Sequence, residues 1–214
     1  MKIFVEGSSK KYVTPNEVVM NLFFTSRGLT YEEAVEKGLN NIYTFNSLVL
    51  LKNGLKESDL KTMGFSVNEE KVYNEETKKF ETKGYIFNQN ATLRTDYNNK
   101  LVSSIISSVA SLDNPPELHF NFGLKKNDSL DEQLIEEAYE DALKKATTIA
   151  QVSNTTIKSI TSIELKSNSQ PQLSNSSFDG SMLKMANNSN INTSHIHPED
   201  IEIERFLACV FEAE

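Results

Sequence analysis

Polar and apolar residues recur with two periods along this chain of 214 residues, and each period predicts one kind of element. Two-residue alternation in short stretches rich in aromatic and β-branched side chains is typical of half-buried strands. Spacings of three to five residues in three longer stretches are typical of helices with one apolar face. Strands are expected within residues 2–6, 17–26, 61–73, 80–95, 116–124, 156–166 and 201–212, and helices within 28–54, 98–113 and 129–151.

Two pairs of strands are close enough along the chain to form hairpins. A polar link that contains Pro15 separates the first two strands, residues 2–6 and 17–26. Proline and polar residues favour a turn, so we expect these strands to pair. The third and fourth strands are joined by the polar residues 74–79, which predict a second hairpin.

Capping residues mark the ends of the first and third predicted helices. Thr30 and Glu33 are spaced as in a capping box, in which hydroxyl and carboxylate each accept a free backbone N–H of the first turn. Ser129 and Glu132 have the same spacing before the third helix. Gly54 follows the first helix and is a typical C-terminal stop.

The third helix is rich in charge, and the arrangement of its charges indicates a solvated face. Its acids lie mostly opposite an apolar stripe that is rich in small residues. Glu140 and Asp141 each precede a lysine by four residues, Lys144 and Lys145, an arrangement worth roughly 0.2–0.5 kcal/mol per pair. We therefore interpret the acids as surface partners rather than as a catalytic carboxylate pair. The stripe, which would let the helix pack closely on a sheet, is Leu134, Ile135, Ala138, Ala142, Ala146 and Ile149.

The fourth strand, within residues 80–95, has one apolar and one polar side. Tyr85, Phe87, Ala91 and Leu93 share the first side, whereas Asn88, Asn90, Thr92 and Arg94 share the second. The second side is therefore expected to face water or a partner.

Together these elements predict an α+β fold with a mostly antiparallel sheet and three amphipathic helices packed on it. The chain is expected to form one domain, 1–214, or two small lobes, 1–79 and 80–214. Residues 167–200 are rich in Asn and Ser and poor in apolar residues, so we expect a mobile loop there.

Composition narrows the class of protein. With 38% hydrophobic and 24% charged residues the chain can bury a real core. A single cysteine, Cys209, cannot form an internal disulfide, and its apolar neighbours Leu207 and Val210 indicate a structural strand thiol. The net charge of −8, without a cluster of Lys and Arg, argues against binding of duplex nucleic acid.

Targeting signals are weak in the sequence. The apolar run Ile3–Val5 is too short for a signal peptide, and no stretch approaches the roughly 20 apolar residues of a membrane span. A soluble cytoplasmic protein is therefore expected, or a periplasmic or exported one if a signal peptide had been removed.

Histidines are the main candidates for chemistry. His195 and His197, with Glu199 and Asp200, bring imidazoles and carboxylates together, and His195, His197 and Asp200 are weak candidates for metal ligands. Two histidines two residues apart on an extended segment point to opposite sides, so they bind one ion only if the backbone turns. His119 lies on the polar side of a strand, without a nucleophile motif such as G-x-S-x-G. The chain has no P-loop and no G-x-G-x-x-G, so no cofactor is expected.

Four stretches, in order, resemble one family. "IFVEGSS" is similar to its first strand, and "LLKNGLKESDLKTMGFSV" to the turn and strand after its first helix. "GYIFNQNATLRTDY" is similar to its central strand and "AYEDALKKATTIAQ" to its last helix. The chain thus resembles the SIMPL domain family, also known as domain of unknown function 541, over nearly its whole length. The matching positions are Gly54, Asp59, Thr62, Gly84, Tyr85, Ala138, Ala142, Lys145 and Ala146.

This resemblance implies no catalytic residues, because the family has no agreed ones. The family includes bacterial oxidative-stress defence proteins, periplasmic immunogenic proteins and a eukaryotic kinase-associated signalling protein, so a link to stress defence is an expectation. We expect a non-enzymatic interaction or self-assembly module that binds copies of itself or a protein partner. The alternative is a cryptic hydrolase or metal-dependent enzyme that uses His195, His197 or His119.

Overall fold

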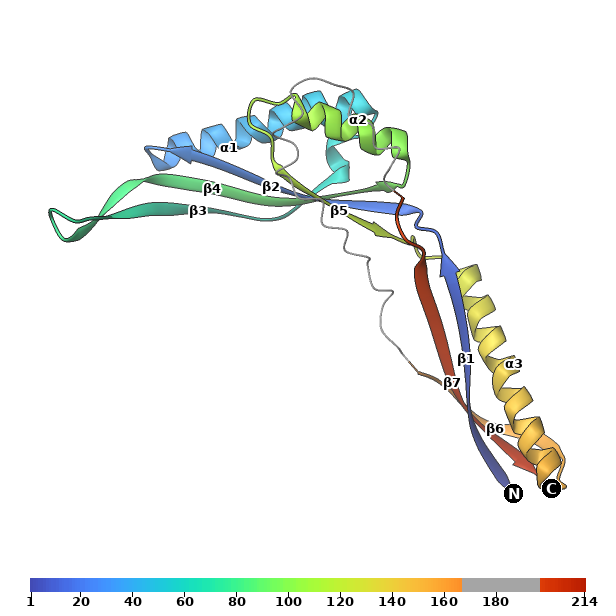
Figure 1. The fold of residues 1–214 in the computed structure, drawn as a ribbon. Coiled ribbons are helices and arrows are strands. Elements are labelled where there is room, and N and C mark those ends of the chain that lie inside the picture. Colours follow the sequence, from blue (N-terminus) through green and yellow to red (C-terminus); the bar gives the residue numbers. More distant parts are fainter. Residues whose placement is uncertain (167–196) are drawn as a thin grey trace. The chain divides into compact units, whose positions relative to one another are not determined.

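The computed structural model describes residues 1–166 and 197–214, and these ranges contain seven strands and three α-helices (Figure 1). The strands form two antiparallel sheets, so the expected α+β class is confirmed. The elements are β1 (Lys2–Val13), β2 (Glu17–Gly28), α1 (Tyr31–Phe45), β3 (Leu60–Asn74), β4 (Lys79–Asp96), α2 (Asn99–Ala110), β5 (Glu117–Gly123), α3 (Asp128–Val152), β6 (Ile157–Lys166) and β7 (Ile201–Ala213).

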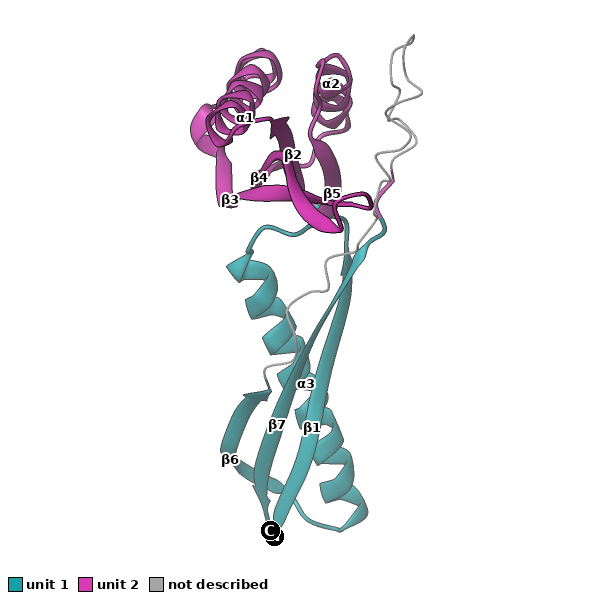
Figure 2. Ribbon diagram, turned by 90° about the vertical axis from the view of Figure 1, so that its left-hand side faces the viewer, with its two compact units in different colours: residues 1–15, 123–174, 199–214 teal, residues 16–122, 175–198 magenta. Residues whose placement is uncertain are grey.

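The chain divides into two compact units, each with its own sheet (Figure 2). Among the described residues, unit 1 comprises 1–15, 123–166 and 199–214, and unit 2 comprises 16–122 and 197–198. These boundaries differ from the continuous lobes 1–79 and 80–214, because β1 pairs with β7 from the other end of the chain. Unit 1 has the strand order β1-β7-β6, and unit 2 has the order β3-β4-β2-β5.

The hairpin expected from the first two strands is wrong. β1 pairs antiparallel with β7 along its whole length, from Lys2 opposite Glu212 to Val13 opposite Ile201. β2 pairs instead with β4 of unit 2. The short polar link around Pro15 permits a hairpin, so local sequence does not exclude one. Each strand pairs where its apolar side is buried, and that choice depends on residues far along the chain.

In unit 1, β1 and α3 approach closely because both carry small residues. A Cβ atom at Gly7 would lie 1.9 Å from the carbonyl oxygen of Ala138 and 2.7 Å from the Cβ of Ala142. The alanines of the predicted stripe are buried and pack on apolar residues of β1 and β7. The prediction of Ile149 in the stripe is wrong: it is exposed, and Ala150, four residues after Ala146, is buried in its place. The buried residues of this core are Ile3, Ala138, Ala142, Ala146, Ala150, Leu207, Cys209, Phe211 and Ala213.

Capping is confirmed for the first helix and differs for the third. The Oγ1 of Thr30 accepts a hydrogen bond from the backbone N–H of Glu33 (3.2 Å). The Glu33 carboxylate accepts from the N–H of Leu29 (2.7 Å), one residue before the expected donor. α3 is capped by Asn127, so the cap predicted at Ser129 is wrong. The Asn127 side chain can accept a hydrogen bond from the first turn just as Ser129 would, and it comes earlier in the chain.

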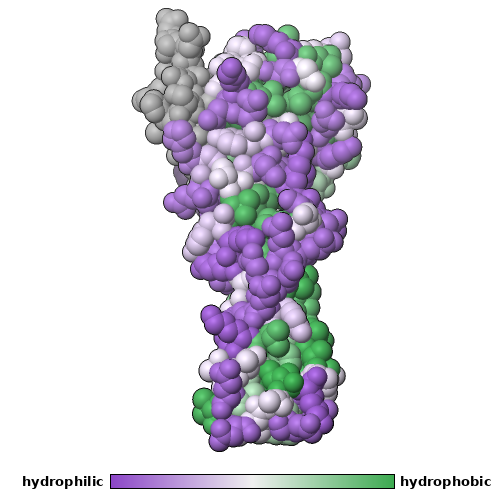
Figure 3. All heavy atoms as spheres, turned by 90° about the vertical axis from the view of Figure 1, so that its right-hand side faces the viewer, coloured by the Kyte–Doolittle hydropathy of each residue, from purple (hydrophilic) through white to green (hydrophobic). Residues whose placement is uncertain are grey.

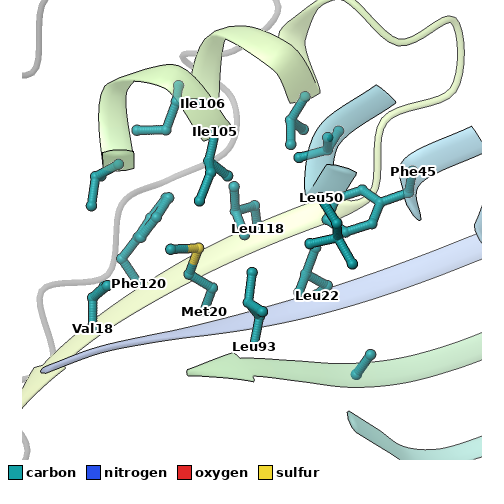
Figure 4. Packing of buried hydrophobic residues seen from close by; sticks show 14 of the residues in the cluster. Val18, Met20, Leu22, Phe45, Leu50, Leu93, Ile105, Ile106, Leu118 and Phe120 are labelled. Atoms are coloured by element: carbon teal, nitrogen blue, oxygen red, sulfur yellow. The ribbon is translucent and has the colours of Figure 1, made fainter. Parts of the chain in front are cut away.

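The core of unit 2 lies between one face of the sheet and the helices α1 and α2 (Figure 4). α1 continues into a π-helix, Asn46–Leu50, and a 3₁₀ turn, Leu51–Asn53. Gly54, with φ of 74°, ends this segment as predicted. The fully buried side chains that fill the centre include Met20, Leu22, Phe45, Leu50, Leu93, Ile105 and Leu118.

The two sides of β4 differ as its sequence predicts. Phe87, Ala91 and Leu93 are buried on the side that faces the helices. On the other side polar groups bond to one another across strands, with Thr25 Oγ1 donating to Asn88 Oδ1 at 3.1 Å. The helices therefore cover one face of this sheet and leave the other face polar.

Candidate functional site

The histidine cluster expected near the last strand is described only in part. His195 lies outside the described residues. His197 is exposed, and Asp200 Oδ1 accepts a hydrogen bond from Thr14 Oγ1 at 2.8 Å. Within residues 1–166 and 197–214, no three His, Cys, Asp or Glu side chains are arranged to hold a metal ion.

His119 makes local contacts on the polar side of β5. Its Nε2 lies 2.8 Å from Glu117 Oε1, and its ring meets that of Phe23 edge-on at 5.5 Å. These contacts hold the imidazole against neighbouring side chains of the same sheet face.

Asp141 and Lys145 bind the outer edge of β1. The Asp141 carboxylate accepts hydrogen bonds from the backbone N–H of Ser8 (2.9 Å) and from Lys145 Nζ (2.7 Å). Lys145 also donates to the carbonyl oxygen of Glu6 (2.9 Å). Lys145 and the Ser8 N–H together hold the pKa of Asp141 below its usual value. The predicted Asp141–Lys145 pair is confirmed, and it also satisfies backbone groups that a neighbouring strand would otherwise bind.

The four edge strands of the two sheets differ in how open they are. β1 is bound by α3, β6 has two register irregularities within ten residues, and β5 has only seven residues. β3 has fifteen residues, and its single extra residue relative to β4 is Met63. From Gly64 to Asn74 its own backbone is uninterrupted, because the second register shift arises from an extra residue of β4. Apart from β1, which α3 binds, β3 therefore has the longest regular edge in the described chain.

The β3–β4 hairpin exposes aromatic rings on the side of the sheet that carries the helices. Phe65 and Phe80 are each 70% exposed, and Tyr73 is 49% exposed. Tyr73 and Phe80 lie opposite each other with ring centroids 5.4 Å apart, and Phe65 stacks on Phe87 at 6.4 Å. We call Phe65, Tyr73 and Phe80 the aromatic face of the hairpin. In Figure 1 the turn of the hairpin lies beyond the start of α1, so the helices leave this part uncovered.

Charged residues lie between these rings on the same side of β3. Alternation along the regular stretch places Phe65, Val67, Glu69, Lys71 and Tyr73 on one side. Lys71 Nζ lies 2.9 Å from Glu69 Oε2, and Thr82 Oγ1 also donates to Glu69. The hydrogen bond from Thr82 and the ion pair with Lys71 lower the pKa of Glu69. This side of β3 therefore has aromatic rings near its two ends and the Glu69–Lys71 ion pair between them.

Other apolar side chains are exposed on unit 1, on α3 and β6. Figure 3 shows apolar patches, interrupted by polar side chains, near the end of unit 1 where both chain termini lie. The exposed apolar residues of α3 and β6 include Ile149, Val152, Ile163 and Leu165. They belong to the flank of a helix and an irregular strand, so they form no regular edge comparable with β3.

Sequence reasoning predicted β3 and its hairpin but not its place at the edge of a sheet. The alternation Phe-x-Val-x-Glu-x-Lys-x-Tyr from residue 65 to 73 was the available signal. Charged residues in the middle of one side of a strand indicate that this side is not fully buried.

Comparison with known proteins identifies a family and no curated relative. A family model described as "SIMPL: Protein of unknown function (DUF541)" matches residues 3–205. No curated protein matches the chain. No helix in the described ranges is both long and apolar enough to cross a membrane.

Proposed function

Because the chain belongs to the SIMPL (DUF541) family, whose function is unknown, we propose a function from its surface: it is a non-enzymatic self-assembly module. In this proposal β3 is the strand through which one copy binds a second copy. The observation that carries the proposal is the regular edge of β3 from Gly64 to Asn74, with which no other strand of the described ranges pairs.

An open edge strand presents a row of backbone N–H and C=O groups that another strand can bind. Natural proteins usually block such edges with helices, irregularities or short length. Here β1 is bound by Asp141 and Lys145, β6 is irregular and β5 is short. The edge of β3 has none of these three features between Gly64 and Asn74. This difference from the other edges supports a role of β3 in binding another strand.

The aromatic face adds apolar area next to the edge. Aromatic side chains are enriched in the centres of protein interfaces, where they bury large area at low entropic cost. Phe65 and Tyr73 lie on β3 itself, and Phe80 lies on its neighbour β4. A strand added to β3 would therefore bury part of the rings of Phe65 and Tyr73.

A second copy of the chain fits this edge better than an arbitrary peptide would. It supplies a strand of the same length, already extended and free of proline. Its charges are of both signs, Glu69 and Glu70 beside Lys71, so antiparallel pairing can set acids against lysines. The outer part of the hairpin is two-stranded, a form that is marginal alone and gains from further strands.

The test is the mass of the full chain in solution, measured by light scattering at about 100 µM, where a complex of micromolar affinity is nearly fully formed. Wild type should have twice the mass of one 24.1 kDa chain. Val67→Lys/Val72→Lys places a lysine on each side of β3 and should give single chains with retained helical and strand content.

The matched control adds the same charges to another edge. Ser159→Lys/Thr161→Lys places two lysines on β6 and should leave the dimer intact. A monomeric wild type at this concentration, or a β3 variant that stays dimeric while folded, contradicts the proposal.

A further inference from the structure

The charges of β3 allow its register with a second copy to be assigned, an inference that rests on the proposed self-assembly. We propose that the two β3 strands pair antiparallel about a two-fold axis at Glu70. In this register Glu69 of each copy lies opposite Lys71 of the other. Glu69 and Lys71 would then determine which strand β3 binds.

The geometry of an antiparallel pair restricts the choices. Residues that lie opposite each other point to the same side of the sheet, so the ring-bearing side of one copy continues into that of the other. Two opposing residues must therefore both have odd numbers or both have even numbers, and their sum is the same for every pair. Each register is thus defined by the residue at its centre, which lies opposite its own copy. A centre at Glu69 uses the whole regular stretch Gly64–Asn74. Centres at Asn68 and Glu70 each use equally much of it, and a centre at Lys71 uses less.

The four registers differ in which charged residues they set opposite each other. A centre at Glu69 sets Glu69 against its own copy, and a centre at Lys71 sets Lys71 against its own copy. Like charges directly opposite each other destabilise a strand pair. In both registers they would meet on the side of the sheet that also carries the aromatic rings. A centre at Asn68 sets Val67 against Glu69 and Phe65 against Lys71, so it leaves every charge on this side opposite an apolar residue. Only a centre at Glu70 gives two Glu69–Lys71 ion pairs, together with two Val67–Tyr73 pairs, on this side.

The intrachain Glu69–Lys71 ion pair fits the same register. The two groups already lie 2.9 Å apart within one strand. Pairing about Glu70 would bring two such pairs together as a ring of four alternating charges. Each acid would then have two lysine neighbours, and each lysine two acids.

The register has one unfavourable feature, the meeting of the two Glu70 side chains on the opposite side of the sheet. Arg27 Nε lies 3.8 Å from Glu70 Oε2 within each copy, and both side chains are reachable by solvent. A guanidinium beside each carboxylate offsets their repulsion. Since the cost is not removed entirely, Glu70→Gln should tighten the dimer.

Charge exchange tests the register. Lys71→Glu alone, and Glu69→Lys alone, should each weaken the dimer by about tenfold or more, because both opposing pairs become like-charged. The double variant Glu69→Lys/Lys71→Glu restores opposite charges and should return the dissociation constant to within about threefold of wild type. Glu70→Gln should lower it by about two- to fivefold.

A second ion pair provides the control. Glu33 and Lys37 form an exposed pair on α1 with Nζ–Oε1 of 2.7 Å. The same single and double exchanges at these positions should leave the dissociation constant unchanged. Thermal unfolding of every variant separates loss of pairing from loss of fold.

The outcomes separate this inference from the proposed function. If wild type and Lys71→Glu dimerise equally while the lysine-bearing β3 variant does not, self-assembly through β3 stands and the register is wrong. If single exchanges weaken the dimer and the double variant does not recover, the register is also wrong. If wild type is monomeric, both proposals fail.

Discussion

The carboxylate of Asp141 on α3 accepts a hydrogen bond from the backbone N–H of Ser8 on β1 at 2.9 Å, across 133 positions of sequence. A helix side chain thereby occupies a site on the strand edge that another strand would use. Lys145 completes the arrangement by donating to the Glu6 carbonyl oxygen at 2.9 Å. The acids of this helix face are thus not equivalent, because Asp141 holds a strand and Glu140 points to solvent.

Removal of the pair should destabilise unit 1 more than removal of its neighbours on the same helix. Asp141→Ala/Lys145→Ala loses two contacts to backbone groups and should cost about 1–2 kcal/mol. Glu140→Ala/Lys144→Ala also removes one acid and one lysine four residues apart, but it breaks none of these contacts and should stay within about 0.5 kcal/mol of wild type. Chemical denaturation monitored by circular dichroism measures both. Equal losses of unfolding free energy in the two double variants would show that the contacts to Ser8 and Glu6 do not stabilise unit 1.

The same carboxylate should give unit 1 a dependence on acid. Since the pKa of Asp141 is lowered in the folded chain, ionisation stabilises the fold. The contribution is complete above the ordinary value of 3.8 and is lost as the pH falls through the lower, folded value. The difference in melting temperature between wild type and Asp141→Asn should therefore be constant near neutrality and shrink below about pH 4. A difference that persists unchanged in acid would contradict this origin.

Glycines at two strand positions should respond very differently to the same methyl group. Gly7→Ala places a Cβ 1.9 Å from the Ala138 carbonyl oxygen, so β1 or α3 must shift, at a cost of about 1–3 kcal/mol or more. Gly64→Ala meets no heavy atom within 4 Å and should be neutral or slightly stabilising. Melting temperatures of the two variants test the ranking. A tolerated Gly7→Ala would mean that the helix is free to move away from the strand.

Two asparagines near the end of the first helical segment should also differ. In the described structure the side-chain oxygen of Asn46 is buried without a hydrogen-bond partner, an arrangement that costs about 1 kcal/mol or more. Asn46→Leu should therefore raise the stability of unit 2. Asn53 Nδ2 donates to the Val49 carbonyl oxygen at 2.6 Å and to Ser108 Oγ at 3.3 Å, so Asn53→Leu should lower it. If both changes altered the stability of unit 2 in the same direction and by the same amount, the hydrogen bonding of the two asparagines would not explain their effects.

Local signals in the sequence were sufficient for most of the elements. Thr30 and Gly54 mark the ends of the first helical segment because caps act through groups only a few residues away. The alternation around Phe87 identified the buried side of β4 for the same reason. The alanines of α3 predicted close packing, although not the strand on which the helix packs.

Strand partners and sheet edges were not predictable from the same signals. The choice of β7 over β2 as the partner of β1 depends on residues about two hundred positions away. The role of Asp141 depends on that choice, since Ser8 is an edge residue only when β1 ends the sheet. The open edge of β3 likewise follows from strand order, which one strand's own residues do not encode.

The pairing of β1 with β7 has a consequence for the order in which the chain is made. During synthesis residues 16–122, which hold all the strands and helices of unit 2, are complete while β7 has yet to be added. Domains fold as their chains become available, so unit 2 can form its core first. β1 is made earliest, yet its hydrogen-bond partner arrives last, and closing so long a loop is slow. Until then residues 3–5 form an unpaired apolar strand, and α3 is the part of unit 1 that can shield Ile3 and Val5 before the sheet exists.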